Sequence, residues 1–315
     1  MTTNKKRILV IGYTQSGQLD RVIKSVSQPL LDSDAIELSY LTLEPAKPFP
    51  FPWPFLYFFN TFPDCVYEEP IELKPLNLES YDYDLIILAY QVWFLSPSLP
   101  ISTFLNSPEA EKIFSGKPVI TLIGCRNMWL MAQEKVKEKL AKLNARLIDN
   151  VVLTDEAHNA ATFIATPLWV LTGNKGPWLG GLIPRAGISD NDILAAKRFG
   201  DAIATKLPNT DSPSEPMLTG LGAVTINERM IASERVAHRS FRIWGKLLRA
   251  TGNKESFLRK CVLVIYIIFL VTLILTVMPV LAILKRIFTP LTRKHTASQK
   301  AYYAGPSGEA NCNNS

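Results

Sequence analysis

The sequence has few of the residues that build metal centres or disulfide frameworks. Its 315 residues include three histidines and four cysteines, and the cysteines lie far apart, at Cys65, Cys125, Cys261 and Cys312. Their spacing matches neither a zinc site nor a disulfide-stabilised domain. The first six residues lack a signal-peptide pattern, so we expect the N-terminal part of the chain in the cytoplasm.

Excess positive charge is absent from the first two thirds of the chain. Residues 1–210 contain 20 Lys and Arg against 22 Asp and Glu, whereas residues 211–315 contain 14 against 6. The net charge of +6 is therefore the sum of −2 and +8. A uniformly basic surface would indicate nucleic-acid binding, but here the cations flank an uncharged apolar stretch. We expect a membrane as partner and no nucleic acid.

That stretch, residues 261–284, contains no charged side chain. As a helix it would be about 36 Å long, enough to cross a hydrocarbon core of about 30 Å. We predict one transmembrane helix there, with a basic amphipathic segment at 228–258 along an anionic membrane surface and a polar tail at 285–315. Cations lie at both ends of the helix, and we favour the orientation with the N-terminal domain inside.

A polar loop without Lys or Arg follows the first apolar run, Ile8–Gly12. The run is typical of a buried strand, and a helical pattern follows the loop. Loop amides, hydroxyls and the helix start would converge on an anion, with these residues as the candidates: Thr14, Gln15, Ser16, Gly17 and Gln18. The missing Lys excludes a Walker loop, and the missing glycines exclude a dinucleotide fingerprint, so a phosphomonoester fits better.

Apolar runs and helical patterns alternate as far as residue 207, which predicts an α/β domain over 1–207. We expect a doubly wound sheet of five parallel strands in the order 2-1-3-4-5. A Pro-rich and Ser-rich linker would follow at 208–227. Two stretches exceed a minimal domain of this kind, an insertion of prolines and aromatics at 44–70 and a loop insertion at 155–187. Substrate specificity is expected there.

Two more loops should lie at the ligand edge of this sheet. The loop after the third strand contains Tyr90, Gln91, Val92, Trp93 and Phe94, whose aromatic rings could cover a planar ligand. The loop after the fourth strand contains Gly124, Cys125 and Arg126, and His158 follows the fifth strand. Trp93 could equally be an ordinary core residue, and His158 an ordinary surface residue.

With these loops, the chain resembles the flavodoxin-like flavoproteins, whose first loop has the pattern Ser/Thr-x-Ser/Thr-Gly-x. The resemblance implies FMN as the cofactor. Residues 14–18 would hold the ribityl phosphate, and the flavin ring would lie against two groups of residues: Gln91 to Phe94, and Gly124, Cys125 and Arg126. Gln18 stands where the family frequently has Asn or Thr.

Three longer motifs resemble one subgroup, usually named dialkylresorcinol condensing enzyme, for which aromatase is the better chemical label. They are Phe-Pro-Phe-Pro-Trp at 49–53, Ala-Tyr-Gln-Val-Trp-Phe at 89–94, and Cys-Arg-Asn-Met-Trp at 125–129. The resemblance implies a lipophilic ring substrate made by a partner ketosynthase, and flavoproteins of this fold suggest a homodimer by analogy. Arg126 would hold a carboxylate, and Tyr90 or His158 would move a proton.

Two other functions fit the same sequence. A membrane-anchored NAD(P)H:quinone reductase or a flavodoxin-type electron carrier would use the same FMN site. A scaffold without flavin would bind a membrane partner through the insertion at 44–70.

Overall fold

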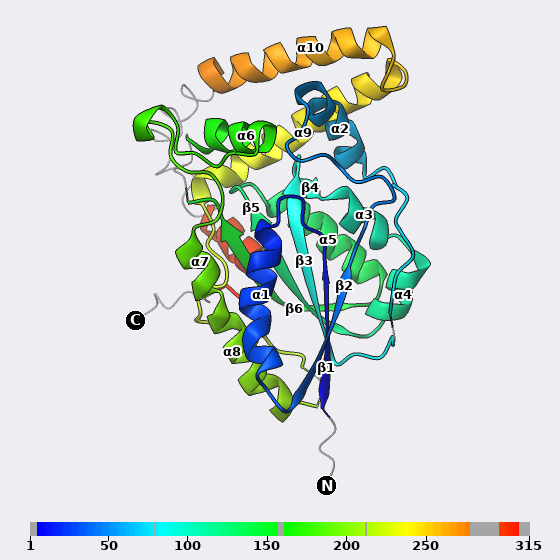
Figure 1. Cartoon of the computed structure of the whole chain (residues 1–315), viewed down its shortest axis with the longest axis vertical. Helices are drawn as coiled ribbons and strands as arrows, with labels where there is room; N and C mark the ends of the chain where they lie inside the picture. The colour runs from blue at the N-terminus through cyan, green and yellow to red at the C-terminus, as the bar shows by residue number, and fades with distance from the viewer. Residues whose placement is uncertain (1–4, 79, 157–160, 212, 278–295, 309–315) are drawn as a thin grey trace.

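A sheet of parallel strands forms the centre of the molecule (Figure 1). The computed structural model describes residues 5–78, 80–156, 161–211, 213–277 and 296–308. The parallel strands are β1 (Lys6–Gly12), β2 (Ile36–Thr42), β3 (Leu85–Trp93), β5 (Pro118–Cys125) and β6 (Arg146–Thr154). Their order is β2-β1-β3-β5-β6, and the short β4 (Ser96–Pro97) pairs antiparallel with β3. Counted without β4, this is the predicted flavodoxin-like order 2-1-3-4-5.

The central strands are almost continuously apolar because helices cover both faces of the sheet. Ile8, Leu9 and Ile11 in β1 are fully buried. Ile8 pairs with Leu85, so β1 and β3 lie side by side where the strand order reverses. The carboxyl ends of these two strands therefore present their loops at one edge of the sheet.

Two helical layers enclose the sheet. One face is covered by α1 (Gln18–Leu31), α7 (Asp190–Ala195) and α8 (Lys197–Lys206), and the other by α3 (Leu99–Phe104), α4 (Pro108–Phe114) and α5 (Leu130–Lys142). The chain leaves α8 through a short 3-10 turn, η2 (Leu207–Asn209). Helices α1 and α8 approach closely because Gly200 has no side chain. A Cβ at this position would lie 2.0 Å from the carbonyl oxygen of Val26.

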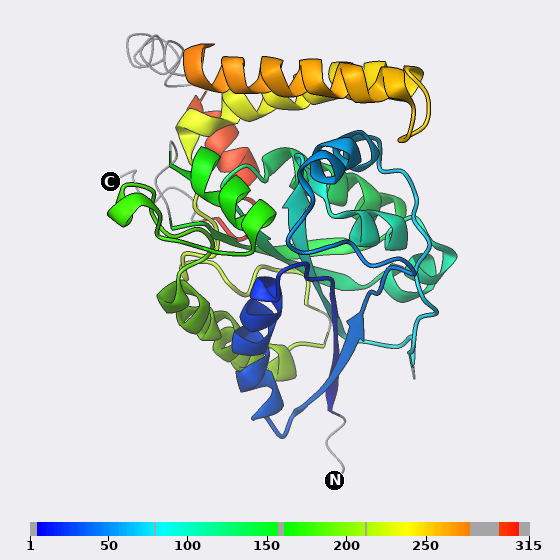
Figure 2. The ribbon, with the colours of Figure 1, turned by 45° about the horizontal axis from the view of Figure 1, so that its top comes forward.

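A further group of helices lies over the carboxyl end of the sheet (Figures 1 and 2). It consists of α2 (Phe55–Tyr67), α9 (Glu228–Ala250) and α10 (Phe257–Thr272), which continues as a π-helical turn, η3 (Leu273–Val277). The three helices share an apolar cluster built on Phe62, Leu248, Leu263 and Tyr266. The continuous helix Phe257–Thr276 is long and apolar enough to span a membrane.

The segments expected to lie outside the domain also contact it. In the predicted linker, the N–H of Val152 in β6 donates to the carbonyl of Ala223 over 2.8 Å. Helix α9 packs on α2 and α5, although a membrane-surface segment was predicted there. In the predicted polar tail, residues 296–304 form a helix. His158 and the part of the predicted transmembrane helix at 278–284 lie outside the described residues.

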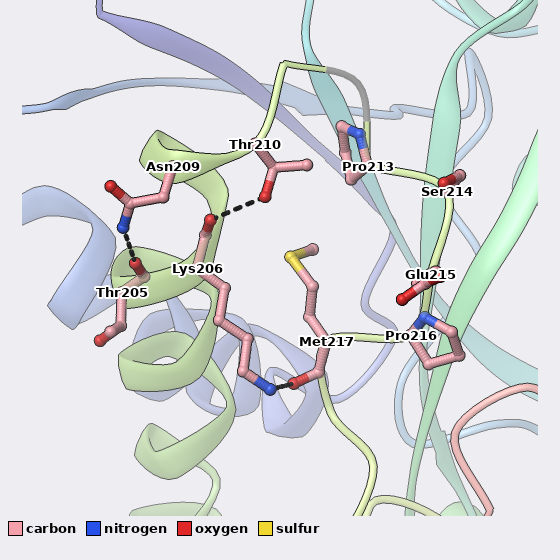
Figure 3. A pocket seen from close by; sticks show the side chains of 9 residues that line it. All are labelled: Thr205, Lys206, Asn209, Thr210, Pro213, Ser214, Glu215, Pro216 and Met217. Atoms are coloured by element: carbon pink, nitrogen blue, oxygen red, sulfur yellow. Dashed lines mark hydrogen bonds between the residues drawn. The ribbon is translucent and has the colours of Figure 1, made fainter.

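The loop insertion at 155–187 contains α6 (Thr162–Thr172) and the turn η1 (Leu179–Gly181). A cavity of about 510 Å³ lies elsewhere, between the end of α8 and residues 213–217 (Figure 3). Lys206 crosses beside it and donates to the carbonyl of Met217 over 2.5 Å. The amide of Met217 bonds to Asp149 in the first half of β6, so this cavity is remote from the carboxyl ends of the strands.

Candidate functional site

The loop between β1 and α1 is built to accept an anion. Gly17 caps α1 with φ of 76°, a left-handed conformation that favours glycine. Nothing lies within 4 Å of the position that a Cβ would occupy there. The amides of Ser16 and Gly17 have no acceptor among the described residues. These N–H groups and the N-terminus of α1 can therefore donate to a bound phosphate.

This loop meets the carboxyl end of β3, which the structure extends to Trp93, beyond the predicted end of that strand. The N–H of Gln15 donates to Oε1 of Gln91 over 3.2 Å, and Nε2 of Gln91 lies 3.5 Å from Oγ1 of Thr14. Residues separated by 76 positions thus form one edge of the site. Gln91 fixes the relative position of the two loops.

The insertion at 44–70 closes over the same edge. Nε2 of Gln15 donates to the carbonyl oxygens of Phe49 and Pro50, at 3.0 and 2.8 Å. The ring of Trp93 meets those of Phe49 and Trp53 edge-on, with centroids 5.1 and 5.3 Å apart. The hydroxyl of Tyr13 also bonds to Gln15. The insertion at 44–70 therefore forms one wall of the candidate site.

Val92 and Phe94, the two neighbours of Trp93, contact other parts of the molecule. Phe94 has a φ of 49°, and its ring lies 4.8 Å from that of Phe58 in α2. It also contacts Phe241 in α9, at 6.3 Å between centroids. Val92 packs on the core behind the sheet. Gln91 and Trp93, at the end of β3, are therefore the residues of this stretch that lie beside the loop between β1 and α1.

The third loop, which we take to include the last residues of β5, contains a glycine packed against α1 and two ionisable side chains. A Cβ on Gly124 would lie 3.2 Å from the side chain of Leu19, so α1 fills this side of the glycine. Burial raises the pKa of the Cys125 thiol, and the carboxyl group of Glu234 adds to this rise. Burial lowers the pKa of Arg126 to about 10, and Asp155 opposes this shift. Arg126 therefore remains a cation at neutral pH.

Asp155 joins the third loop to the insertion at 155–187. Its Oδ2 accepts from the N–H of Gly187 at 2.9 Å and from Oγ1 of Thr166 at 3.0 Å. Gln18 bonds to the same stretch through Ile188, whose N–H and carbonyl both lie 3.2 Å from the Gln18 amide. The Gln18 side chain therefore holds this loop, and its backbone belongs to the first turn of α1.

Glu234 is a buried carboxyl group near Arg126 and Cys125 that no sequence pattern predicted at this site. It belongs to α9 and is fully buried. Its Oε1 accepts from the N–H of Met131 at 2.8 Å, in the first turn of α5, and its Oε2 has no hydrogen-bond partner. Burial raises the pKa of Glu234 to about 7, while the backbone bonds and Arg126 act in the opposite direction. No local motif distinguishes Glu234 from an exposed helix residue.

Tyr90 lies behind the site. Its side chain is fully buried, and its hydroxyl donates to Oε1 of Gln133 at 2.5 Å. Gln133 in turn donates to Thr121 at 3.0 Å, so Tyr90 belongs to a polar network under the sheet. Burial raises the pKa of Tyr90. A role for Tyr90 or His158 in proton transfer stays a prediction.

The geometry of fold and loops defines a flavodoxin-like α/β protein. Among the described residues, no group of three His, Cys, Asp or Glu side chains could hold a metal ion. No protein-family model matches the sequence. No curated protein sequence matches it either.

Several solved structures are similar in fold. A flavoprotein in complex with FMN from Lactobacillus acidophilus NCFM is 16% identical, with a TM-score of 0.39, over 47% of this chain and 93% of the other. A flavodoxin from the domain Archaea is 11% identical, with a TM-score of 0.35, over 64% and 98%. Oxidised flavodoxin 1 from Bacillus cereus is 16% identical, with a TM-score of 0.32, over 64% and 98%.

Proposed function

We propose that this protein is an FMN-dependent oxidoreductase of the flavodoxin-like class that acts on a lipophilic ring substrate. The observation that carries the proposal is the contact between the loop after β1 and the end of β3, made by Gln15 and Gln91. This contact lies at the topological switch point, where doubly wound sheets bind their ligands. An anion site and an aromatic surface lie together there, which suits a phosphate joined to a planar ring.

The residues of the site fit FMN. Ser16, Gly17 and the first turn of α1 would hold the phosphate through N–H groups, and Thr14 and Ser16 add hydroxyl donors. Trp93 and Gln91 would border the ring with an aromatic edge and an amide. When bound, the flavin would supply hydride transfer to or from a ring carbon of the substrate.

The chain's own residues would orient the substrate and exclude water. Arg126 is a half-buried cation at the ligand edge and would hold a carboxylate through paired N–H donors. Trp53 and Trp93 form an apolar wall, and Trp53 is only 5% exposed. The rings of Phe58, Phe94, Phe62 and Tyr266 continue from this wall to α10. These rings are mostly buried, so a lipophilic substrate entering from a membrane would meet the exposed Phe55, Leu56 and Tyr57 of α2 first.

The sequence motifs support a narrower form of the proposal, in which a cyclohexanedione-type precursor becomes an aromatic resorcinol. A partner ketosynthase would supply the precursor, and a homodimer is proposed by analogy. The alternative is a membrane-associated NAD(P)H:quinone reductase or electron carrier, which the same apolar helices would also suit. Oxidation of NAD(P)H with menadione as acceptor would favour this alternative, whereas aromatisation of a dialkylated cyclohexanedione without NAD(P)H would favour the narrower proposal.

Binding of FMN to the full-length chain tests the site directly. The purified protein should show a flavin absorbance spectrum, and mass spectrometry of the released chromophore should identify FMN. Gly17→Ala should weaken FMN binding about tenfold or more. A non-glycine residue in the left-handed region costs about 1–2 kcal/mol, and the new Cβ would stand where the phosphate is expected.

Gly116→Ala is a matched control. Gly116 has φ of 73°, also has nothing within 4 Å of its Cβ position, and lies in the turn before β5. Both variants should lose similar stability, but only Gly17→Ala should lose FMN affinity. A colourless wild-type protein that does not bind added FMN would overturn the proposal and favour the scaffold.

A further inference from the structure

Both ends of the apolar helix α10 are tied to the same domain. Before it, α9 packs on α2 and α5, and Met230 and Ile231 are buried there. After it, residues 296–308 return to the sheet (Figure 1). A helix that crossed a bilayer once would place these two flanking segments on opposite sides of the membrane.

Residues 296–308 make buried side-chain contacts with the domain. Tyr303 is 4% exposed in the core between sheet and helices, and its hydroxyl accepts from Arg235 in α9 at 2.9 Å. The Ser307 hydroxyl donates to Asp149 at 2.7 Å and accepts from the N–H of Asn150 at 2.5 Å. Ser307 is 2% exposed. These are buried contacts with β6, and crossing the membrane once would break all of them.

Helix α10 lies along the domain and does not project from it (Figure 2). Arg259 at its start donates through Nε to Oδ1 of Asn60 in α2 at 2.8 Å. Leu263 and Tyr266 are each 1% exposed, and the Tyr266 ring lies 4.5 Å from that of Phe62. One face of α10 is therefore bound to the α2 and α9 helices.

The opposite face of α10 is apolar and uncovered. Its large side chains are between 46% and 82% exposed at Phe257, Leu258, Val264, Ile265, Ile268, Val271 and Leu275. Residues 228–276 contain nine Lys and Arg against three Glu. Several of these cations are exposed on α9, at Arg239, Arg242 and Lys246. An apolar face on a segment with this net positive charge suits an anionic lipid surface.

We propose that α10 lies in the plane of one leaflet of an anionic phospholipid membrane and that the chain does not cross it. The exposed face of α10 enters the boundary between headgroups and acyl chains. The substrate surface of α2 then adjoins the membrane directly. This inference rests on the proposed membrane association and is independent of FMN binding.

The first test asks on which side of the membrane each segment lies. Full-length protein, with Cys261→Ser and Cys312→Ser, is bound to vesicles of phosphatidylcholine and phosphatidylglycerol from outside. Asp34→Cys on the domain and Ser298→Cys in the returning helix are then labelled with a membrane-impermeant maleimide. Both positions are exposed, and both should react equally with and without detergent. Labelling of Ser298→Cys only after detergent would overturn the proposal. The parent without added cysteines gives the background.

The second test measures how deeply three positions along the apolar helix enter the bilayer. Bimane attached to cysteine at Leu258, Ile265 or Leu275, one position at a time, should be quenched equally by a spin label at the headgroup level. A steady increase of depth from Leu258 to Leu275 would show a helix that penetrates the bilayer, and would overturn the in-plane arrangement even if both ends lie on one side.

The third test separates this inference from membrane association as such. Ile265→Ser with Ile268→Ser should reduce vesicle binding about tenfold or more, because both side chains lie on the exposed face. Leu194→Ser, which replaces a 69% exposed leucine on α7, should leave binding unchanged. Binding should weaken in high salt and on pure phosphatidylcholine. A wild-type protein that binds no vesicles would refute membrane association, with FMN binding unaffected.

Discussion

At the scale of single residues, Glu234 shows how strongly position outweighs residue type. A carboxyl group normally titrates near 4.5, but burial raises the pKa of Glu234 to about 7. The helix start of α5 offers it one N–H, from Met131. Its second oxygen is buried without a partner, which makes the ionised form costly.

This burial predicts a pH dependence of folding. The folded state binds the Glu234 proton more tightly than the unfolded state, so the contribution of Glu234 to stability is greatest below about pH 4.5 and falls as the pH rises toward about 7. The loss should reach about 3 kcal/mol at most. Glu234→Gln should remove this slope, as measured by urea unfolding across the same range. Glu228→Gln, exposed near the start of the same helix, should keep it. A slope unchanged in Glu234→Gln would contradict the assignment.

At the scale of elements, the layer of helices depends on close contact between α1 and α8. The position that a Gly200 Cβ would take is 2.0 Å from the carbonyl oxygen of Val26 and 3.0 Å from Pro29. The first of these atoms is backbone and cannot rotate away. The helices would have to separate to admit even one methyl group.

Gly200→Ala should therefore destabilise the protein, by about 1–3 kcal/mol. Replacing glycine by alanine inside a helix usually stabilises a protein, so the expected change in the free energy of unfolding has the opposite sign here. Chemical denaturation should reveal it, with Asp201→Ala on the exposed side of α8 changing stability by about 0.5 kcal/mol or less. A stabilised Gly200→Ala variant would show that α1 and α8 do not pack this closely.

At the scale of the whole molecule, the flavodoxin-like domain is completed by the C-terminal third of the chain. Helix α9 buries Met230 and Glu234 against it, and Ile226 and Tyr303 enter its core. A fragment ending near residue 210 would leave these surfaces uncovered. Experiments on the proposed flavin site therefore require the full chain.

Two adjacent tyrosines test whether the C-terminal residues contribute to the stability of the domain. Tyr303→Ala should destabilise the domain by about 3 kcal/mol or more, since the side chain is 4% exposed in the core. Tyr302→Ala should cost about 1 kcal/mol or less, because Tyr302 is 58% exposed and its contacts with Glu134 and Lys137 lie on the surface. Thermal unfolding of the full chain compares the two. Equal and small effects would mean that residues 296–308 do not dock on the sheet.

The fold could be predicted from the sequence because the patterns of its strands and helices are local. Fully buried strands such as Ile8–Ile11 and Leu85–Ala89 must be continuously apolar, and the helices between them must be amphipathic, so both patterns are visible in short windows. The strand order then follows from a small set of allowed connections. The adjacency of Gln15 and Gln91 was predictable on the same basis, because the switch point determines which loops meet.

The rest of the site depends on contacts between distant segments. Phe49 and Trp53 were recognised as aromatic, but their packing against Trp93 depends on how the insertion folds back. Glu234 reaches α5 across 103 positions of sequence. Its neighbours in the chain describe a basic amphipathic helix, and such a pattern does not reveal which surface the helix covers.

The sequence by itself determined the parallel sheet, the polar loop between β1 and α1 and an apolar stretch of membrane-spanning length, because each follows from local composition and periodicity. Only the tertiary structure decided which face of α10 is covered, where Tyr303 is buried, and that Glu234 lies under the third loop. These properties arise from burial between segments far apart in the chain, and the free energy of that burial depends on the partner surface as much as on the residue itself.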